Sequence, residues 1–539
     1  MVKDWRDELE RWLAPFVAAL KHKTRGRMCP AYIVGLIGPG DRKSVQPMAA
    51  RDAGVSYDQL HHFIANGVWD AAPLEAALLA EADRQVGGND AWLIVDDTAL
   101  PKKGRHSVGV APQYASALGK NANCQTLVSL TLASGEVPVM IGLRLFLPES
   151  WTSDPARIDR ACVPDRHRAF GTKPEIALAE IDRVRAAGVR FGCVLADAGY
   201  GLSAPFRQAL TERGLTWAVG IPFTQKVYPA DVAMIFPVAG RGRPRQRHIP
   251  NVKSVAAQAM LQTARWRTIS WRRGTKGQLS ARFAAMRVRV ADGPTQRIRD
   301  MGAQHLPGEK LWVIGEHRST GECKYYLSNL PADTPLKQLA AAIKARWVCE
   351  QAHQQLKEEL GLDHFEGRSW TGLHRHALMT MIAYAFLQSR RLKQAKGGKK
   401  NPRPTAAAKP ARDPAGHPPS PRTAAARPMS SLPQIFANEK SAKVVLVELA
   451  SEAGLALSDD ERGVLQDVRH CGVGPPLPVA KTIHKHKRIG PRPMVTNLVL
   501  DRTGKREGIR MLFERARADL ERALPGKRVR FGVVVLLPD

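Results

Sequence analysis

The stretch "AWLIVDD" (residues 91–97) is a short, nearly continuous apolar run that ends in two aspartates. Such a run is typical of a strand buried inside an α/β protein. A second run, "RFGCVLAD" (190–197), has the same character and ends at Asp197. The two runs predict strands of one sheet, at whose edge Asp197 can meet Asp96 or Asp97.

The sequence around these strands continues the α/β pattern over residues 89–223. "CQTLVSLTLAS" (124–134) and "EVPVMIGLRLFLP" (136–148) are separated by a glycine, which predicts a β-hairpin. Thr172 is placed to cap a helix that has Pro174 and Glu175 in its first turn and Gly188 just past its end. "LTWAVGIP" (215–222) predicts one more strand.

The segments on either side differ in character. Residues 1–88 predict a helical region, in which Ser56 and Gln59 form a capping box. Short helices of this kind fit either a helix-turn-helix DNA reader or a plain bundle that packs on the next domain. Residues 224–334 predict a mostly β insertion. Residues 335–393 return to helix, first a long one beginning at Thr334 and Pro335 and then an apolar one.

The C-terminal part has a different composition. Residues 394–432 are rich in proline, alanine, glycine and basic side chains, which predicts a disordered basic linker. Residues 433–539 predict a small α/β appendage in which no chemistry is visible.

The net charge of the chain indicates what kind of molecule it binds. With 81 Lys and Arg against 50 Asp and Glu, the 539-residue chain has a formal net charge of +31, which favours a polyanion, nucleic acid above all. No apolar run reaches about 18 residues and the start lacks a signal-peptide core, so we expect a cytoplasmic protein without a membrane partner. The seven cysteines are scattered and never spaced as CxxC, which indicates neither a disulfide framework nor a zinc site.

The first helix after the insertion carries a distinctive face. In "ARWVCEQAHQQLKEELGLDHF" (345–365), Arg346, Glu350 and Lys357 lie within roughly 40° of one another around the helix. Taken alone, such a face is more often a solvated surface with weak ion pairs.

Together with the strand-end aspartates, however, Glu350 completes a set of three carboxylates. Clustered carboxylates repel one another unless a cation intervenes, and hard divalent metals prefer oxygen ligands. Asp96, Asp97, Asp197 and Glu350 are therefore the candidate ligands for two Mg²⁺ ions, with Mn²⁺ as a substitute. Two such ions about 3.5–4 Å apart activate a water or 3′-hydroxyl and stabilise the leaving oxygen in phosphodiester displacement. Arg346 and Lys357 would then hold flanking DNA phosphates.

Several motifs resemble the DDE transposases of bacterial insertion sequences, and they cover about residues 90–390. The motifs are "LIVDDTALPKKGRHSVGVAPQY", "GKNANCQ", "LPESWTSD", "FGTKPEIALAEI", "LADAGYG" and "GLDHFEGRSWTGLHRH". Arg346, Glu350 and Lys357 fit the R-E-K part of the signature of one large group. That signature begins with a tyrosine, where this chain has Ile343.

The resemblance implies an RNase H-like catalytic domain, with a mixed sheet flanked by helices and interrupted by the β insertion. The family pattern of Asp, any residue, then Ser or Thr fits Asp96 with Thr98 and favours Asp96 over Asp97 as the first catalytic aspartate. Asp97 is then a hydrogen-bonding neighbour. Asp96, Asp197 and Glu350 are the expected catalytic residues.

The implied activity is cut-and-paste transposition. Such an enzyme, acting at the nucleoid, binds the terminal inverted repeats of its element, cleaves double-stranded DNA at the ends and joins the freed 3′-hydroxyls to target DNA. It works as a homodimer or larger synaptic complex. Two alternatives stay open: a catalytically inactive repressor that only binds element ends, and a metal-dependent nuclease without strand transfer.

Other polar residues allow two interpretations each. Lys102, Lys103 and Arg105 lie in a loop after the first strand that either contacts DNA or is simply solvated. Trp370 either wedges into distorted DNA or packs in the core. The dispersed spacing of the histidines favours polar packing over metal binding; they are His106, His374 and His376.

Overall fold

The computed structural model describes residues 5–51, 54–115, 118–236, 247–274, 277–298 and 302–397. Helix α14 (Trp370–Gly397) continues four residues into the expected linker. The rest of that linker and the whole expected appendage, 433–539, lie outside the described residues. Among the described helices, none is long and apolar enough to cross a membrane.

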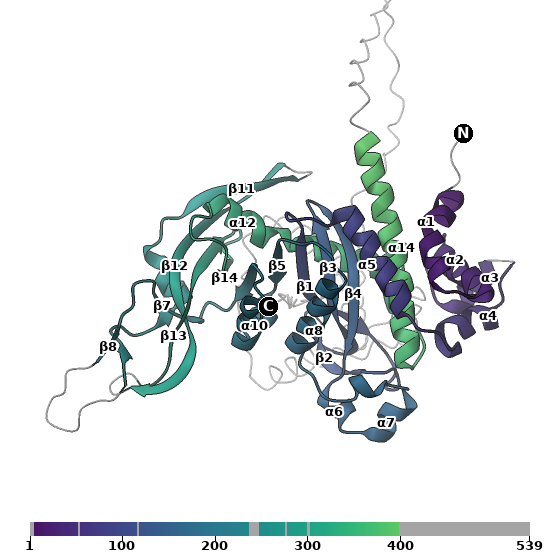
Figure 1. Cartoon of the computed structure of the whole chain (residues 1–539), viewed down its shortest axis with the longest axis horizontal. Helices are drawn as coiled ribbons and strands as arrows, with labels where there is room; N and C mark the ends of the chain where they lie inside the picture. The colour runs from purple at the N-terminus through teal and green to yellow at the C-terminus, as the bar shows by residue number, and fades with distance from the viewer. Residues whose placement is uncertain are drawn as a thin grey trace, which may run out of the picture. The chain divides into compact units, whose positions relative to one another are not determined.

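A mixed sheet organises the described chain (Figure 1). Five of its strands are neighbours in the order β4, β3, β1, β5, β6. Strand β1 is antiparallel to β3, and β3 to β4, whereas β1, β5 and β6 are mutually parallel. Their bounds are Val137–Phe146 (β4), Lys120–Ser134 (β3), Trp92–Pro101 (β1), Cys193–Ala196 (β5) and Trp217–Ile221 (β6).

Strand register brings the first two acidic positions together. Val95 of β1 pairs with Ala196 of β5, and these are the last paired residues of the two parallel strands. Asp96 and Asp197 are the next residues of their strands. The predicted meeting of Asp96 and Asp197 is therefore confirmed, although β1 does not end at the aspartates as expected but continues to Pro101, paired with β3.

Local sequence signals explain how these strands are connected. The β3–β4 hairpin turns at Gly135, whose φ of +57° is a conformation that glycine adopts without strain. Helix α8 (Lys173–Ala186) begins with the predicted capping box, in which the backbone N–H groups of Thr172 and Glu175 each meet the other's side chain. Gly188 follows the helix with a φ of +75°.

The β-rich segment extends the same sheet. Strand β14 (Cys323–Ser328) pairs antiparallel with β6, which places the segment in direct hydrogen-bonded contact with the core strands. Beyond β14 the sheet continues through β13 (Gly302–His317), β12 (Gly277–Ile298), β7 (Lys226–Pro229) and β10 (Val255–Ala256), with β11 (Arg267–Gly274) on β12. Strand β2 (Ala111–Ala115) closes the other edge on β3, and β8 (Met234–Ile235) and β9 (Ile249–Pro250) form a separate small pair.

The N-terminal helices share a hydrophobic core with α14 and the sheet. Leu9, Leu36 and Leu78 belong to the same buried cluster as Phe386. The hydroxyl of Tyr32 lies 2.8 Å from His376 Nδ1, which ties α2 to α14. These helices are α1 (Trp5–Ala19), α2 (Lys23–Ile37), α3 (Val45–Arg51), α4 (Tyr57–His61), a π-helical turn (His62–Asn66) and α5 (Ala72–Val86). The predicted capping box of Ser56 and Gln59 starts α4.

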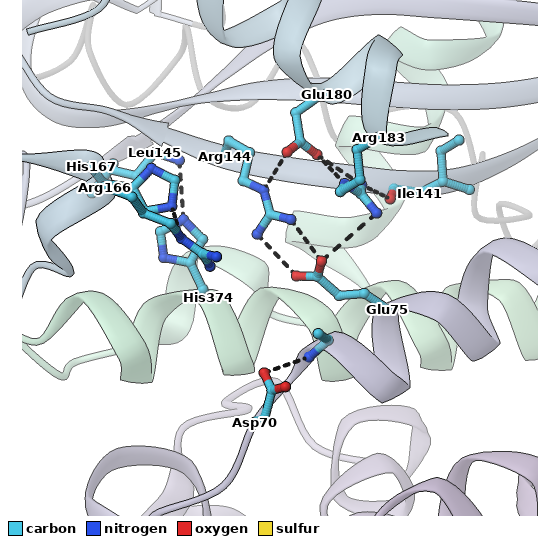
Figure 2. Close-up of polar contacts among 11 residues, drawn as sticks. Asp70, Glu75, Ile141, Arg144, Leu145, Arg166, His167, Glu180, Arg183 and His374 are labelled. Atoms are coloured by element: carbon cyan, nitrogen blue, oxygen red, sulfur yellow. Dashed lines mark hydrogen bonds and ion pairs between the residues drawn. The ribbon is translucent and has the colours of Figure 1, made fainter. Parts of the chain in front are cut away.

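A buried ion network fixes α5 to the sheet (Figure 2). Arg144 on β4 donates both terminal nitrogens to Glu75 of α5, at 2.9 and 2.7 Å, and its Nε to Glu180 of α8 at 2.7 Å. Arg183 of α8 adds two further hydrogen bonds to Glu180. Three elements far apart in sequence are thereby joined by charge as well as by packing.

The helix expected to run unbroken from residue 335 is in fact two helices. Helix α12 (Leu336–Ala345) ends and α13 (Trp347–Glu358) begins at Arg346. At this point Cys349 N donates to Arg346 O at 3.1 Å, a tighter turn than an α-helix makes. The described part of the chain also contains α6 (Glu149–Thr152), α7 (Pro155–Arg160), α9 (Ala198–Gly201), α10 (Ala204–Glu212), α11 (Ala257–Met260) and short 3₁₀ turns at Asp165–His167, Leu261–Thr263 and Leu362–His364.

Candidate active site

The side chains of Asp96 and Asp97, which are adjacent on β1, lie on opposite faces of the sheet, because side chains alternate along a strand. Asp96 Oδ2 accepts from Arg346 Nη1 at 2.5 Å and from the buried Cys349 Sγ at 3.0 Å, both from the α12–α13 side. Asp97 Oδ2 instead accepts from Lys173 Nζ, at 2.5 Å, at the start of α8. Its Oδ1 accepts from the Tyr200 hydroxyl. The strand therefore gives the two carboxylates different neighbours.

Asp197 follows β5 and caps the short helix α9. Its Oδ1 accepts from Tyr200 N at 3.2 Å, so Tyr200 contacts both Asp197 and Asp97. Burial raises the pKa of Asp197, and the negative charge of Asp96 adds to that rise, while Arg346 opposes it. Burial also raises the pKa of Asp97 against the opposing charge of Lys173.

Arg346 lies among the carboxylates. Its Nη1 binds Asp96, and its Nη2 donates to Glu350 Oε1 at 2.7 Å, which confirms that the side chains of Arg346 and Glu350 share a face. Burial lowers the pKa of Arg346, but the charge of Asp96, with smaller contributions from Cys349, Glu350 and Asp197, outweighs burial and raises it. Glu350 keeps 61% of its side chain exposed and so remains open to solvent.

The donor chemistry suits a hard divalent cation, since Asp96, Asp197 and Glu350 offer only carboxylate oxygens. In the described ranges, however, no group of three or more His, Cys, Asp or Glu side chains is arranged to hold a metal ion. The reason is visible in the contacts: the Arg346 guanidinium takes one oxygen of Asp96 and one of Glu350. The guanidinium thus occupies two of the carboxylate oxygens that a bound cation could use.

A cleft of about 680 Å³ opens beside these residues. Asp197, Arg346 and Glu350 line one part of it, and a second part is basic and aromatic, with Arg318, Lys324, Tyr325, Tyr326, Lys344 and Phe223. Sequence reasoning missed this second part, because most of it comes from β14 and its connections.

Some of the basic groups in the cleft are already paired. The fully buried Glu316 accepts from Lys344 Nζ at 2.7 Å, from the Tyr326 hydroxyl at 2.8 Å and from Arg318 Nε at 3.1 Å. Burial lowers the pKa of Lys344, and Glu316 opposes this shift. Glu316 thus holds two of the cations at fixed positions in the cleft.

The predicted DNA-binding lysines differ in their settings. Lys102 Nζ donates to the backbone oxygens of Asp363 and Phe365, at 3.0 and 2.8 Å, and so ties the end of β1 to the segment after α13. Lys357 is half-buried; burial lowers its pKa, and Asp363 opposes this shift. Lys103 and Arg105 are exposed in their loop.

His374, His376 and Trp370 have packing roles, whereas His106 does not. His376 is fully buried and His374 is half-buried, and desolvation lowers the pKa of His376 to about 4 and that of His374 to about 3. Trp370 is 7% exposed and stacks on His167 with ring centres 4.8 Å apart. His106 is exposed.

His353, three residues after Glu350, was not predicted. Its Nε2 lies 2.8 Å from the hydroxyl of the buried Ser129, and that hydroxyl also lies 3.0 Å from the backbone oxygen of Asp96. A hydroxyl has one proton to donate, and the carbonyl oxygen can only accept, so His353 Nε2 must donate to Ser129. Burial lowers the pKa of His353 to about 4. This chain of hydrogen bonds fixes α13 against β1.

Comparison with known proteins gives the class of the molecule. Residues 15–278, just under half of the chain, match the family described as DDE superfamily endonuclease. This segment contains Asp96, Asp97 and Asp197 and ends before Glu350.

A named relative makes the assignment more specific. Over 190 residues the chain is 31% identical to the probable transposase for insertion sequence element IS701 from Microchaete diplosiphon. The alignment covers 35% of this chain and 47% of the relative, so the chain spans about half of the relative's length. The predicted resemblance to the DDE transposases of insertion sequences is confirmed.

Among the solved structures that align with the chain is the piggyBac transposase synaptic complex with hairpin DNA. It aligns with a TM-score of 0.34 and 11% identity over 74% of each chain, a likeness too weak to bear on the assignment.

Proposed function

We propose that this protein is a DNA transposase that cuts at the ends of an insertion sequence and transfers the freed strands into target DNA. The observation that carries the proposal is the register of β1 and β5, which sets Asp96 beside Asp197, together with the Arg346 side chain that joins Asp96 to Glu350. In the strand order β4, β3, β1, β5, β6, each of the first two strands is antiparallel to the next and β1, β5 and β6 are parallel, which supports an RNase H-like catalytic core.

The residues have distinct proposed roles. Asp96, Asp197 and Glu350 would hold divalent metal, two Mg²⁺ ions or Mn²⁺ in their place, which supplies an activated water or 3′-hydroxyl and stabilises the leaving oxygen. Asp97, fixed by Lys173 and Tyr200, positions the middle of β1 and, through Tyr200, the carboxylate of Asp197 that caps α9. Arg346, freed from the carboxylates, would bind a DNA phosphate in the cleft.

The partners follow from charge and from the reaction. The net charge of +31 suits double-stranded DNA, both element ends and target. Lys357, Lys103 and Arg105 are proposed DNA contacts; Lys102 holds the backbone nearby. Because two ends are processed together, we propose a homodimer or larger synaptic assembly at the nucleoid, with the domain boundaries expected from the sequence.

Strand transfer in vitro tests the proposal. Purified full-length protein, Mg²⁺ and a DNA fragment carrying both element ends are incubated, and wild type is compared with Glu350→Gln. Glu358→Gln is the matched control, because it removes the same charge from an exposed position on the same helix. We expect joined products from wild type and the control and none from Glu350→Gln.

Each other outcome identifies an alternative. Cleavage that depends on Glu350 but yields no joined product indicates a nuclease. End binding by wild type without cleavage or joining indicates an inactive repressor, an outcome consistent with the guanidinium that bridges Asp96 and Glu350.

A further inference from the structure

A second cleft, of about 700 Å³, lies between the N-terminal helices and the start of α14. Its lining comes from four places in the sequence: Arg25 of α2, the segment 65–70 that follows α4, Cys162, and Ser369, Thr371 and Arg375 around the start of α14. None of these residues belongs to the candidate active site.

Two arginines hold the segment that forms one wall of this cleft. Arg375 is only 4% exposed and donates to the backbone oxygens of Ile64, at 3.3 Å, and Trp69, at 2.6 Å. Its guanidinium also lies 4.2 Å from the centre of the Trp69 ring. Arg25 Nη2 donates to the backbone oxygen of Val68 at 2.6 Å. The acceptors in these hydrogen bonds are all neutral carbonyls.

The two positive charges are therefore not neutralised. Within the described residues, neither guanidinium forms an ion pair with a carboxylate; Asp70 also lines the cleft, but its Oδ1 accepts from Ala72 N at 3.0 Å. Burial, and then the charge of Arg25, lower the pKa of Arg375 to about 10. Two cations that repel each other gain stability from an anion bound between them. A guanidinium has five N–H donors, and the contacts above use two of Arg375 and one of Arg25.

The held segment also presents an apolar tip. Val68 is 89% exposed, although the carbonyl oxygen of the same residue is bound by Arg25. A fixed apolar tip beside guanidinium N–H groups is complementary to the backbone of a nucleic acid, in which phosphates alternate with apolar sugar faces.

We infer that this second cleft binds a backbone phosphate of duplex DNA. Arg25 contacts the phosphate directly, Arg375 supplies the second positive charge and holds the segment 65–70, and Val68 packs on the adjoining sugar. The inference rests on the proposed function and deepens it, because it assigns a specific DNA contact to the N-terminal helical region.

Three variants that each lower the net charge by one test the inference. Arg25→Gln removes the proposed contact. Val68→Asp adds a negative charge at the tip and leaves both arginines and their hydrogen bonds in place. Arg27→Gln is the matched control, since Arg27 is exposed and lies roughly 200° around α2 from Arg25. All are made in full-length protein carrying Glu350→Gln, so that DNA is not cleaved, and thermal unfolding checks that each is folded.

The readout is affinity for a random-sequence duplex as a function of salt. We expect Arg25→Gln to bind about tenfold more weakly and to reduce the slope of log affinity against log salt by about 0.9, the value for one phosphate contact. Val68→Asp should weaken binding in the same direction, and Arg27→Gln should match the parent protein.

Two results overturn the inference while leaving the proposed function standing. One is parent-level DNA binding by both Arg25→Gln and Val68→Asp. The other is inorganic phosphate that raises the unfolding temperature of the parent but not of Arg25→Gln, with unchanged DNA binding, which would mean that the cleft takes a free anion. Absence of duplex binding by the parent protein would overturn both.

Discussion

Replacing Arg144 with methionine tests how firmly the N-terminal helices are joined to the catalytic sheet. Arg144 is the cation between Glu75 of α5 and Glu180 of α8, and it is largely buried (Figure 2). Methionine keeps much of its volume but leaves two carboxylates with only Arg183 between them. Removing one partner from a buried network costs about 3–5 kcal/mol of unfolding free energy.

A surface pair on the same helix provides the control. Arg213 bonds Asp182 of α8 at 2.8 Å, with 27% and 47% of the two side chains exposed. Solvent screening limits such a pair to about 0–1 kcal/mol, so Arg213→Met should cost little. Urea titrations of full-length wild type and both variants, followed by tryptophan fluorescence, measure the difference.

Acid should reduce the effect of Arg144→Met. Burial raises the pKa of Glu180, but Arg144 and Arg183 outweigh burial and lower it. A lowered folded-state pKa stabilises the protein above the unfolded pKa of a glutamate, about 4.3, and that stabilisation is lost as pH falls through the folded-state pKa. The difference in unfolding free energy between wild type and Arg144→Met should therefore be full at pH 7 and shrink only as the pH falls below about 4.3.

The reasoning is refuted if Arg144→Met costs no more than Arg213→Met at pH 7, or if the gap between Arg144→Met and wild type widens in acid. An early separate transition in Arg144→Met would show instead that the N-terminal helices can leave the core on their own.

Two further substitutions probe the candidate site. His353→Leu should lower the single-turnover strand-transfer rate about 10–100-fold with DNA affinity unchanged, because Ser129 loses its hydrogen-bond donor. His353→Gln keeps an amide donor and should recover part of the rate. Equal rates for the two variants would contradict this. Gly201→Ala should destabilise the protein by about 1–3 kcal/mol and abolish strand transfer, because the added Cβ would lie 1.9 Å from the backbone oxygen of Gly220. Gly104→Ala is the control, since a Cβ added there has no atom within 4 Å. It should have no effect in thermal unfolding or strand-transfer assays.

Much of the fold around Asp96 and Asp197 follows from local sequence. Apolar runs that end in aspartate predict buried strands. The parallel pairing of β1 with β5 then places Asp96 and Asp197 next to each other across the two strands. Capping residues such as Thr172 act within a few positions and are equally readable. The four-residue spacing of Arg346 and Glu350 predicts their contact for the same reason.

The remaining features depend on distant partners. Arg346 and Asp96 are 250 positions apart, and His353 and Ser129 are 224 apart, so no local pattern signals either contact. The choice between Asp96 and Asp97 likewise needs the knowledge of which face of β1 meets α13. The alternation rule gives two faces but does not say which helix covers each of them.

The pairing of β14 with β6 has a mechanical consequence. Tyr325 to Ser328 are hydrogen-bonded in register to Ile221 through Ala218, and β6 is in turn paired with β5, the strand that ends at Asp197. Neighbouring strands are about 4.8 Å apart, so the β-rich segment is a stiff continuation of the sheet and not a body on a flexible tether. A displacement of this segment would therefore act through β6 on β5, the strand that Asp197 follows.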